Sequence, residues 1–211
     1  MLKGINHLAF ITADMEATIR FWRDLLGFTL DAGVGHDGYR HYFFRSANNQ
    51  VAFFHYEGAT SMERKNHGVK TEEPRGFDHV AFTVDGPKEL FELKDKLDAA
   101  GIEVTGPVDH GTIWSIYFFD PNNLPLEASW DCVEVTAKPA FYEVAPLAVA
   151  EEGADAQPGH WPEPTQRTPR SEWKAKRGNG FVMRETFLKE GKGRMTPELE
   201  KLLAEQGEAA E

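Results

Sequence analysis

The stretch NHLAFITADMEATIRFWRDLLGF (6–28) occurs a second time, in altered form, as DHVAFTVDGPKELFELKDKLDAAGI (78–102). An offset of 72 residues aligns the two copies and places His7 on His79. Self-similarity at a fixed spacing indicates a structural module that the chain uses twice.

Each copy predicts a short strand that leads into an amphipathic helix. In the first copy Asp14 is placed to cap the helix and Gly27 to end it, whereas in the second Pro87 occupies the first turn and Gly101 ends the helix. The positions that recur at helical spacing are Ile19, Trp22, Leu25 and Leu26 in the first helix and Leu90, Leu93 and Leu97 in the second.

Three strand-like runs follow each helix. They are FTLDAG (28–33), RHYFFRS (40–46) and NQVAFFHYE (49–57) in the first copy, and IEVTGP (102–107), TIWSIYFF (112–119) and LPLEASW (124–130) in the second. The sequence therefore predicts an α+β protein with two tandem βαβββ modules, 1–57 and 77–135. The charged, Gly- and Pro-bearing residues 58–76 are expected to link them.

The remaining residues, 136–211, have a different character. They are rich in Pro and polar residues and end in a predicted short helix from Pro197 to about Ala204. Such a Pro-rich extension cannot build a core of its own. Its apolar anchors indicate that it wraps the body or a second subunit, and a mobile tail is the alternative; the anchors are Trp161, Trp173, Phe181 and Phe187.

Composition restricts the partners that the chain can have. Of its 211 residues, 34 are acidic and 23 basic, a formal charge of −11, which repels nucleic acid and anionic membrane surfaces. No apolar segment is long enough for a membrane span. A single cysteine, Cys132, excludes an intramolecular disulfide. These features predict a cytoplasmic protein that acts on a small molecule, without nucleic-acid or membrane partners.

The repeat also predicts a metal site. A duplicated module is expected to supply one ligand from each first strand, here His7 and His79, and one from each last strand. Glu127 lies in an otherwise apolar last strand, where a buried carboxylate requires a cation. Aligning NNQVAF (48–53) with NNLPLE (122–127) places Phe53 opposite Glu127, so the fourth ligand is absent. Two imidazoles and one carboxylate leave room for substrate and dioxygen, as in non-haem Fe(II) oxygenases.

Over about residues 4–131 these features resemble the vicinal oxygen chelate superfamily, which pairs βαβββ modules in a half-barrel around a divalent metal. The superfamily includes glyoxalases, fosfomycin-resistance enzymes and extradiol ring-cleaving dioxygenases. The stretch 108–127 is similar to the type I extradiol dioxygenase signature, through Val108-Asp-His110, Ile116-Tyr117, Asp120-Pro121 and Glu127. One position departs from the signature, because Asn123 stands where Gly or Pro is expected; Asn tolerates a left-handed backbone.

The resemblance implies a role for each matching residue. His7, His79 and Glu127 would hold Fe(II), or alternatively Mn(II). His55, two residues beyond Phe53, would be the acid/base group, and His110 and Tyr117 would donate hydrogen bonds to bound oxygens. The implied reaction is the opening of a small aromatic diol by O2, in a homodimer or higher homo-oligomer.

Two other functions remain open. One is a glyoxalase-like or fosfomycin-resistance-like lyase or transferase that uses Mn, Zn or Ni; the other is a non-catalytic module that binds a small molecule. His36, His67 and His160 match no expected position and are interpreted as structural or solvent-facing, whereas His41 heads a strand and could line the pocket. Arg40 and Arg45 could meet a substrate carboxylate.

Overall fold

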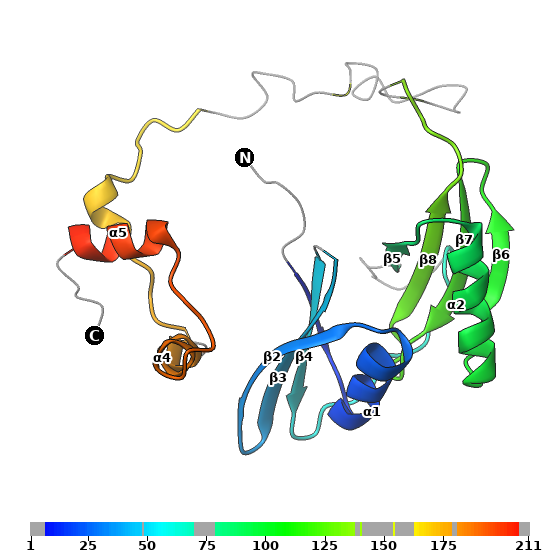
Figure 1. Cartoon of the computed structure of the whole chain (residues 1–211), viewed down its shortest axis with the longest axis horizontal. Helices are drawn as coiled ribbons and strands as arrows, with labels where there is room; N and C mark the ends of the chain where they lie inside the picture. The colour runs from blue at the N-terminus through cyan, green and yellow to red at the C-terminus, as the bar shows by residue number, and fades with distance from the viewer. Residues whose placement is uncertain are drawn as a thin grey trace. The chain divides into compact units, whose positions relative to one another are not determined.

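The computed structural model describes residues 7–47, 49–69, 79–137, 140, 154, 163–178 and 181–206. The chain divides into two compact units, residues 1–140 and 141–211. The described residues of the first unit form two four-stranded mixed sheets with their helices, and these sheets do not close into a barrel, which confirms the prediction of two βαβββ modules (Figure 1). None of the described helices is both long and apolar enough to cross a membrane.

The first module has the element order that the repeat predicts. Its strands are β1 (Leu8–Ile11), β2 (Thr29–His36), β3 (Tyr39–Ser46) and β4 (Asn49–Tyr56), arranged β1-β4-β3-β2 with β1 parallel to β4. The helix α1 (Met15–Ile19) continues as the π-helical segment η1 (Arg20–Leu25). Asp14 caps α1 by accepting a hydrogen bond from the Ala17 amide at 3.0 Å. Gly27 follows η1 with a φ of 80°, which favours glycine.

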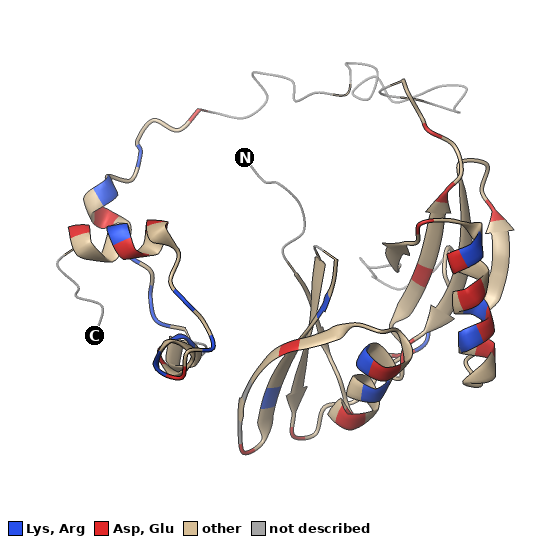
Figure 2. Cartoon of the chain, viewed as in Figure 1, with Lys and Arg blue, Asp and Glu red and all other residues tan. Residues whose placement is uncertain are grey.

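The second module repeats this topology. Its strands β5 (Val80–Thr83), β6 (Thr105–Asp109), β7 (Ile113–Phe119) and β8 (Pro125–Asp131) are arranged β5-β8-β7-β6. The helix α2 (Pro87–Ala99) carries alternating charges on its exposed face (Figure 2). β6 begins later than predicted because the Ile102 amide is used to close α2, donating to the Leu97 carbonyl at 3.0 Å.

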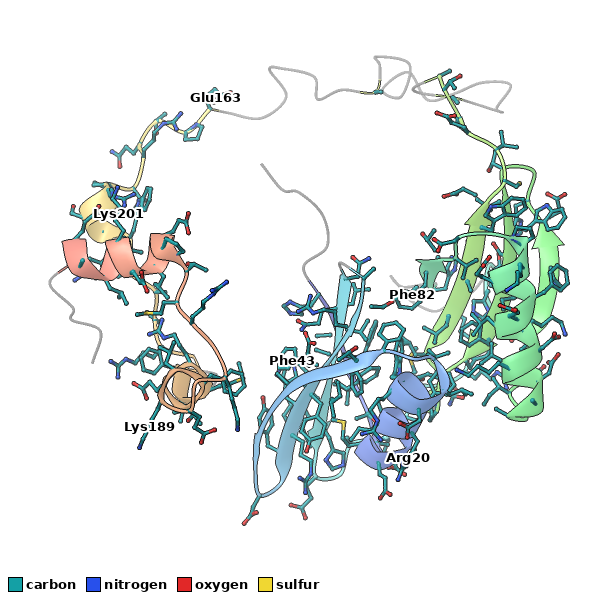
Figure 3. All side chains as sticks on the ribbon, in the orientation of Figure 1. Arg20, Phe43, Phe82, Glu163, Lys189 and Lys201 are labelled. Carbon is teal, nitrogen blue, oxygen red and sulfur yellow. The ribbon has the colours of Figure 1, made fainter. Side chains whose placement is uncertain are left out.

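Aromatic packing joins the two modules into one core. Trp22 of η1 is fully buried, and its ring lies 5.4 Å from Phe53 of the first sheet. Phe82 of β5 reaches across from the second module (Figure 3), with its ring 5.5 Å from Phe28 and 5.9 Å from Trp22. The helix of the first module therefore packs against the first strand of the second.

A buried polar cluster at the turn before β8 also joins the modules. The Asn122 side chain accepts a hydrogen bond from Thr12 Oγ1 at 2.7 Å and donates to Thr18 Oγ1 at 3.1 Å. Asp120 accepts from Trp22 Nε1 at 3.2 Å and from the Leu124 amide at 2.9 Å. The Asp-Pro-Asn-Asn sequence of this turn thus connects two segments about 100 residues apart in the chain.

Replacing Trp22 with Ala is expected to lower the free energy of unfolding by about 3–5 kcal/mol. The change removes the largest buried side chain from the shared core and takes one hydrogen-bond donor from the buried Asp120. Urea unfolding measures the effect. Phe91→Ala is the control, because Phe91 is 45% exposed on α2 and its removal should cost no more than about 0.5 kcal/mol. Equal losses for both variants would contradict the proposed core.

The stability of the protein should also depend on pH through Asp120. Burial raises the pKa of this carboxyl above its ordinary value of 3.8, although its N–H donors oppose the shift. Because the folded state then holds a proton that the unfolded state has released, the free energy of unfolding falls as the pH rises from about 4 through the raised pKa. Asp120→Asn should flatten this fall in urea titrations at several pH values. If the wild type instead becomes more stable relative to Asp120→Asn as the pH rises across this range, the N–H donors to Asp120 outweigh burial in setting its pKa.

The second unit contains short helical elements: η2 (Arg170–Glu172), α4 (Phe181–Lys189) and α5 (Pro197–Glu205). α5 lies where the sequence predicts the last helix, with Thr196 as its cap, whereas α4 was not predicted. Arg170 pairs with Glu205 at 2.7 Å, and Gln206 donates to the Trp173 carbonyl at 2.8 Å. Neither α4 nor α5 has a buried residue.

Candidate metal and substrate site

One face of the second sheet gathers two of the predicted ligands. His79 immediately precedes β5, and its Nε2 lies 2.7 Å from Oε2 of Glu127 in the neighbouring strand β8. Glu127 is only 3% exposed, whereas about a third of the His79 side chain is exposed. A carboxylate and an imidazole nitrogen that face each other in this way are donors suited to a divalent transition metal.

Serine hydroxyls orient the buried carboxylate. Ser129 Oγ donates to Glu127 Oε1 at 2.7 Å, and Ser115 Oγ lies 3.1 Å from Ser129 Oγ. One carboxylate oxygen is therefore held by the sheet while the other points to His79. Residues that fix a ligand in this way commonly matter for metal affinity. Ser129 could have been found in the sequence, since residues two apart on a strand share a face.

The predicted hydrogen-bonding residues lie on the same face. Tyr117 of β7 is directly opposite Glu127 in the sheet register, and its hydroxyl lies 2.7 Å from Nε2 of His110. The Tyr117 ring lies 6.2 Å from the ring of His79. Asn123 has a φ of 61°, which confirms the left-handed backbone expected at this turn.

A residue from the linker joins this face, although no sequence pattern predicted it. His67 Nε2 lies 2.9 Å from the carbonyl oxygen of Leu126, and its ring is 4.8 Å from Tyr117 and 5.9 Å from His79. The linker makes a second contact with the sheet through Arg64, whose guanidinium lies over the ring of Phe119, 4.1 Å from its centroid. His67, expected to be structural or solvent-facing, is half-buried, and tertiary contacts bring its ring to this face.

The third predicted ligand, His7, lies elsewhere. It precedes β1 of the first sheet, where it is exposed and close enough to His41 for its charge to act on that ring. The described residues include all three predicted ligands, yet among them no group of three or more His, Cys, Asp or Glu side chains could hold a metal ion. Within one chain, His79 and Glu127 are together and His7 is apart.

The strand register also corrects the alignment of the two modules. Ala81 pairs with Glu127, and its repeat equivalent Ala9 pairs with Ala52, so Ala52 rather than Phe53 occupies the position of the missing ligand. A shift of one residue reverses the face of every side chain in a strand. Phe53 accordingly packs on Trp22 in the core.

The same register places His55 on the face of the first sheet opposite to His7. His55 lies two residues from Phe53 and pairs with Arg40 of β3, so its side chain shares the helix-covered face. Because side chains alternate along β4, His55 faces away from the His7 side, and the expectation that His55 faces the metal is therefore wrong. Its acid/base role stays a prediction that rests on the resemblance alone.

His41 lies on the His7 face instead. Its ring stacks on Phe54, with centroids 3.6 Å apart and an angle of 14° between the planes. Its buried Nε2 has no hydrogen-bond partner among the described residues. Burial lowers the pKa of His41, and the nearby His7 lowers it further. This face of the first module therefore carries two histidines: the exposed His7, and His41, whose ring is stacked on Phe54.

Comparison with known proteins places this arrangement in a family. The family model described as the Glyoxalase/Bleomycin resistance protein/Dioxygenase superfamily matches residues 4–128. The chain belongs to this superfamily. Residues beyond 128, which include the whole second unit, lie outside the match.

Two curated superfamily relatives are about equally similar to the chain. Biphenyl-2,3-diol 1,2-dioxygenase 2 of Rhodococcus globerulus is 31% identical over 128 residues, which are 59% of this chain and 61% of the relative. Glutathione transferase FosA of Serratia marcescens is 30% identical over 136 residues, which are 60% of this chain and 80% of the relative. The chain thus spans about three fifths of the dioxygenase.

Solved superfamily structures share the fold. A glyoxylase/bleomycin resistance protein/dioxygenase domain from Frankia sp. EAN1pec superposes with a TM-score of 0.54 at 20% identity, covering 62% of this chain and 99% of that one. A fosfomycin resistance protein, FosX, from Listeria monocytogenes superposes with a TM-score of 0.51 at 21% identity, covering 63% and 97%.

Proposed function

We propose that the protein is a metal-dependent enzyme that opens the ring of a small aromatic diol with O2, and that Fe(II) is its metal. One observation carries the proposal: the buried Glu127 faces His79 on the same sheet face as the Tyr117–His110 pair. The similarity to a biphenyl-diol dioxygenase supports this reaction class.

The residues present fit a divalent metal. Glu127 is almost completely buried, and its partners among the described residues are an imidazole and a hydroxyl, so a cation would compensate the cost of its burial. His79 and Glu127 are the donors from one module, and His7 is the proposed third. A bound Fe(II) would supply the Lewis-acid and redox chemistry that a diol and dioxygen require.

We further propose that His7 comes from a second copy of the chain. The first and second modules are repeats, so the face that carries His7 and the face that carries His79 are equivalent surfaces that can pair about a two-fold axis. Ile11 and Tyr56, on the His7 face, are 56% and 43% exposed, which leaves an apolar surface for such pairing. Two copies would then form two identical sites.

The other residues of the face would bind substrate and move protons. The Tyr117 hydroxyl, held by His110 at 2.7 Å, can donate a hydrogen bond to a substrate oxygen, and His110 can take or return the proton. Phe119 and the ring of His67, 4.9 Å apart, form an apolar wall that would limit water. Ser129 would keep Glu127 oriented throughout.

The test begins with metal analysis of protein purified without oxygen, followed by oxygen uptake with a panel of catechols. Stoichiometric iron, uptake and a yellow ring-opened product are expected. Tyr117→Phe should retain the metal and lose most of the uptake, which separates chemistry from assembly. Iron-loaded protein that consumes no oxygen with any diol would refute the dioxygenase.

A second candidate is a transferase or lyase that uses another divalent metal, favoured by the 30% identity to a glutathione transferase of which the chain covers 80%. Thiol-dependent loss of fosfomycin in Mn(II)-loaded protein would support it. A non-catalytic binding module would hold no stoichiometric metal and would bind an aromatic ligand unaltered.

A further inference from the structure

The helix side of the first sheet contains two adjoining cavities that the proposed reaction does not use. A cavity of about 410 Å³ lies between the first helix and β3, and one of about 740 Å³ lies against β2 and β3. They share Ile19, Arg40 and Tyr42. Both volumes are in the range of small-molecule sites, roughly 300–1,000 Å³. This face is opposite to that of His7. Tyr42 pairs with Phe53, and Arg40 is two residues from Tyr42, so both side chains lie on the Phe53 face.

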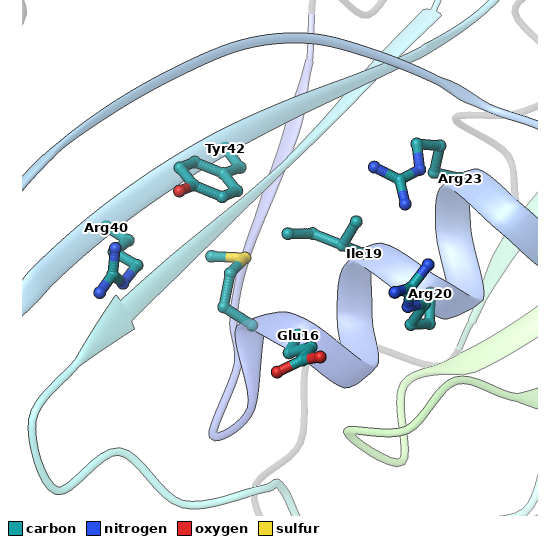
Figure 4. A pocket seen from close by; sticks show the side chains of 7 residues that line it. Glu16, Ile19, Arg20, Arg23, Arg40 and Tyr42 are labelled. Carbon is teal, nitrogen blue, oxygen red and sulfur yellow. The ribbon is translucent and has the colours of Figure 1, made fainter.

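Positive charge gathers around the smaller cavity in a protein whose net charge is −11. Three arginines and one glutamate line it: Arg20, Arg23, Arg40 and Glu16 (Figure 4). Asp24 pairs with Arg20 at 2.9 Å and with Arg23 at 2.6 Å, so these two are largely satisfied. Arg40 has no ion pair within the described part of the chain, so it is available to an external anion.

The cavity also has an apolar floor and one flat aromatic wall. Met15 is 6% exposed and Ile19 is half-buried, and Ile19 points from the helix toward Tyr42 (Figure 4). Tyr42 lies against bare backbone, because a Cβ on Gly33 would come within 2.6 Å of its ring. The absence of a side chain at Gly33 therefore leaves room for the Tyr42 ring against β2.

We propose that this cavity is a second ligand site, distinct from the His79–Glu127 face, and that it takes a small aromatic carboxylate. The guanidinium of Arg40 binds the carboxylate through paired N–H donors, and Tyr42, two residues along the same face of β3, supplies its hydroxyl as a further donor. The flat apolar body packs on Tyr42 and Ile19. Since no metal ligand takes part, this site is independent of the proposed reaction.

Calorimetric titration of the full-length protein with benzoate tests the proposal, with benzamide as a neutral probe and inorganic phosphate as a second anion. Benzoate should bind at least about tenfold more tightly than either. Arg40→Ala should weaken benzoate binding at least about tenfold, and Arg40→Lys should recover only part of it, because lysine lacks the planar fork. Lys88→Ala is the matched control, since it makes the same change in net charge at a remote position on α2. The Lys88 side chain is 73% exposed.

The outcomes separate this site from the metal site. His79→Ala and chelator treatment should leave benzoate binding unchanged, whatever they do to activity. Unchanged binding in Arg40→Ala, with the circular dichroism of the wild type, would overturn the proposal. So would phosphate binding as tight as that of benzoate, because the apolar floor would then contribute nothing.

Discussion

Glu127→Ala is expected to abolish stoichiometric metal binding and, with it, the proposed reaction. The variant removes the buried carboxylate donor whose Oε2 lies 2.7 Å from Nε2 of His79. We expect metal affinity to fall by more than about 100-fold, since even a residue that only orients a ligand is worth roughly 10- to 100-fold. Chelator-competition titration of purified, refilled protein measures the change.

Two further variants give an intermediate loss and a control for comparison with Glu127→Ala. Ser129→Ala removes the hydroxyl that holds Glu127 Oε1, and it should lower metal affinity by about 10- to 100-fold while the ligands remain. Glu92→Ala removes an exposed carboxylate that pairs with Lys88, and it should change nothing. Full metal content in Glu127→Ala would show that the site lies elsewhere.

A heterodimer of His7→Ala and Glu127→Ala chains should regain about half of the wild-type metal sites, although each variant alone has none. If His7 of one copy joins His79 and Glu127 of the other, one of the two composite sites in the heterodimer keeps all three ligands. If the three ligands instead met within a single chain, each chain would lack one of them and no site would be restored. The structure favours the first outcome, because His7 stands apart from the other two in the chain.

Co-expression of the two chains with different affinity tags isolates the heterodimer, and metal analysis with light scattering gives the sites per dimer. A dimer of two His7→Ala chains that carry the two different tags is the control and should remain empty. Recovery of no metal in the mixed heterodimer would refute assembly of the site across two copies, as would a wild-type protein that is monomeric at the concentrations used.

The fold follows from local sequence signals. The duplicated segments, Asp14 as a helix cap, and Gly27 and Gly101 as helix stops appear in the structure where the sequence predicts them, and each predicted strand is present with some shifts at its ends. The nearness of Tyr117, His110 and Glu127 was also predictable, because one antiparallel hairpin and its flanking loop carry all three. These features depend on interactions between residues near one another in the chain.

The face that each β4 side chain occupies could not be predicted from the sequence, because a shift of one residue in strand register reverses it. The alignment through NNQVAF placed Phe53 at the ligand position, whereas the pairing of Ala9 with Ala52 shows that Phe53 faces the core and His55 shares its side. Both alignments look alike in sequence because the strand is apolar on both faces. Only the hydrogen-bonded ladder distinguishes them.

The sequence by itself determined the repeat and the two modules, and it supplied the residue types of the proposed ligands, since these depend on residue chemistry and short spacing. Tertiary structure alone decided that His67 of the linker reaches Tyr117, that Trp22 and Asp120 tie the modules together, and that His7 lies apart from His79. The physical reason is that long-range contacts depend on how whole modules pack. That packing is set by the summed burial of many side chains, which no single motif records.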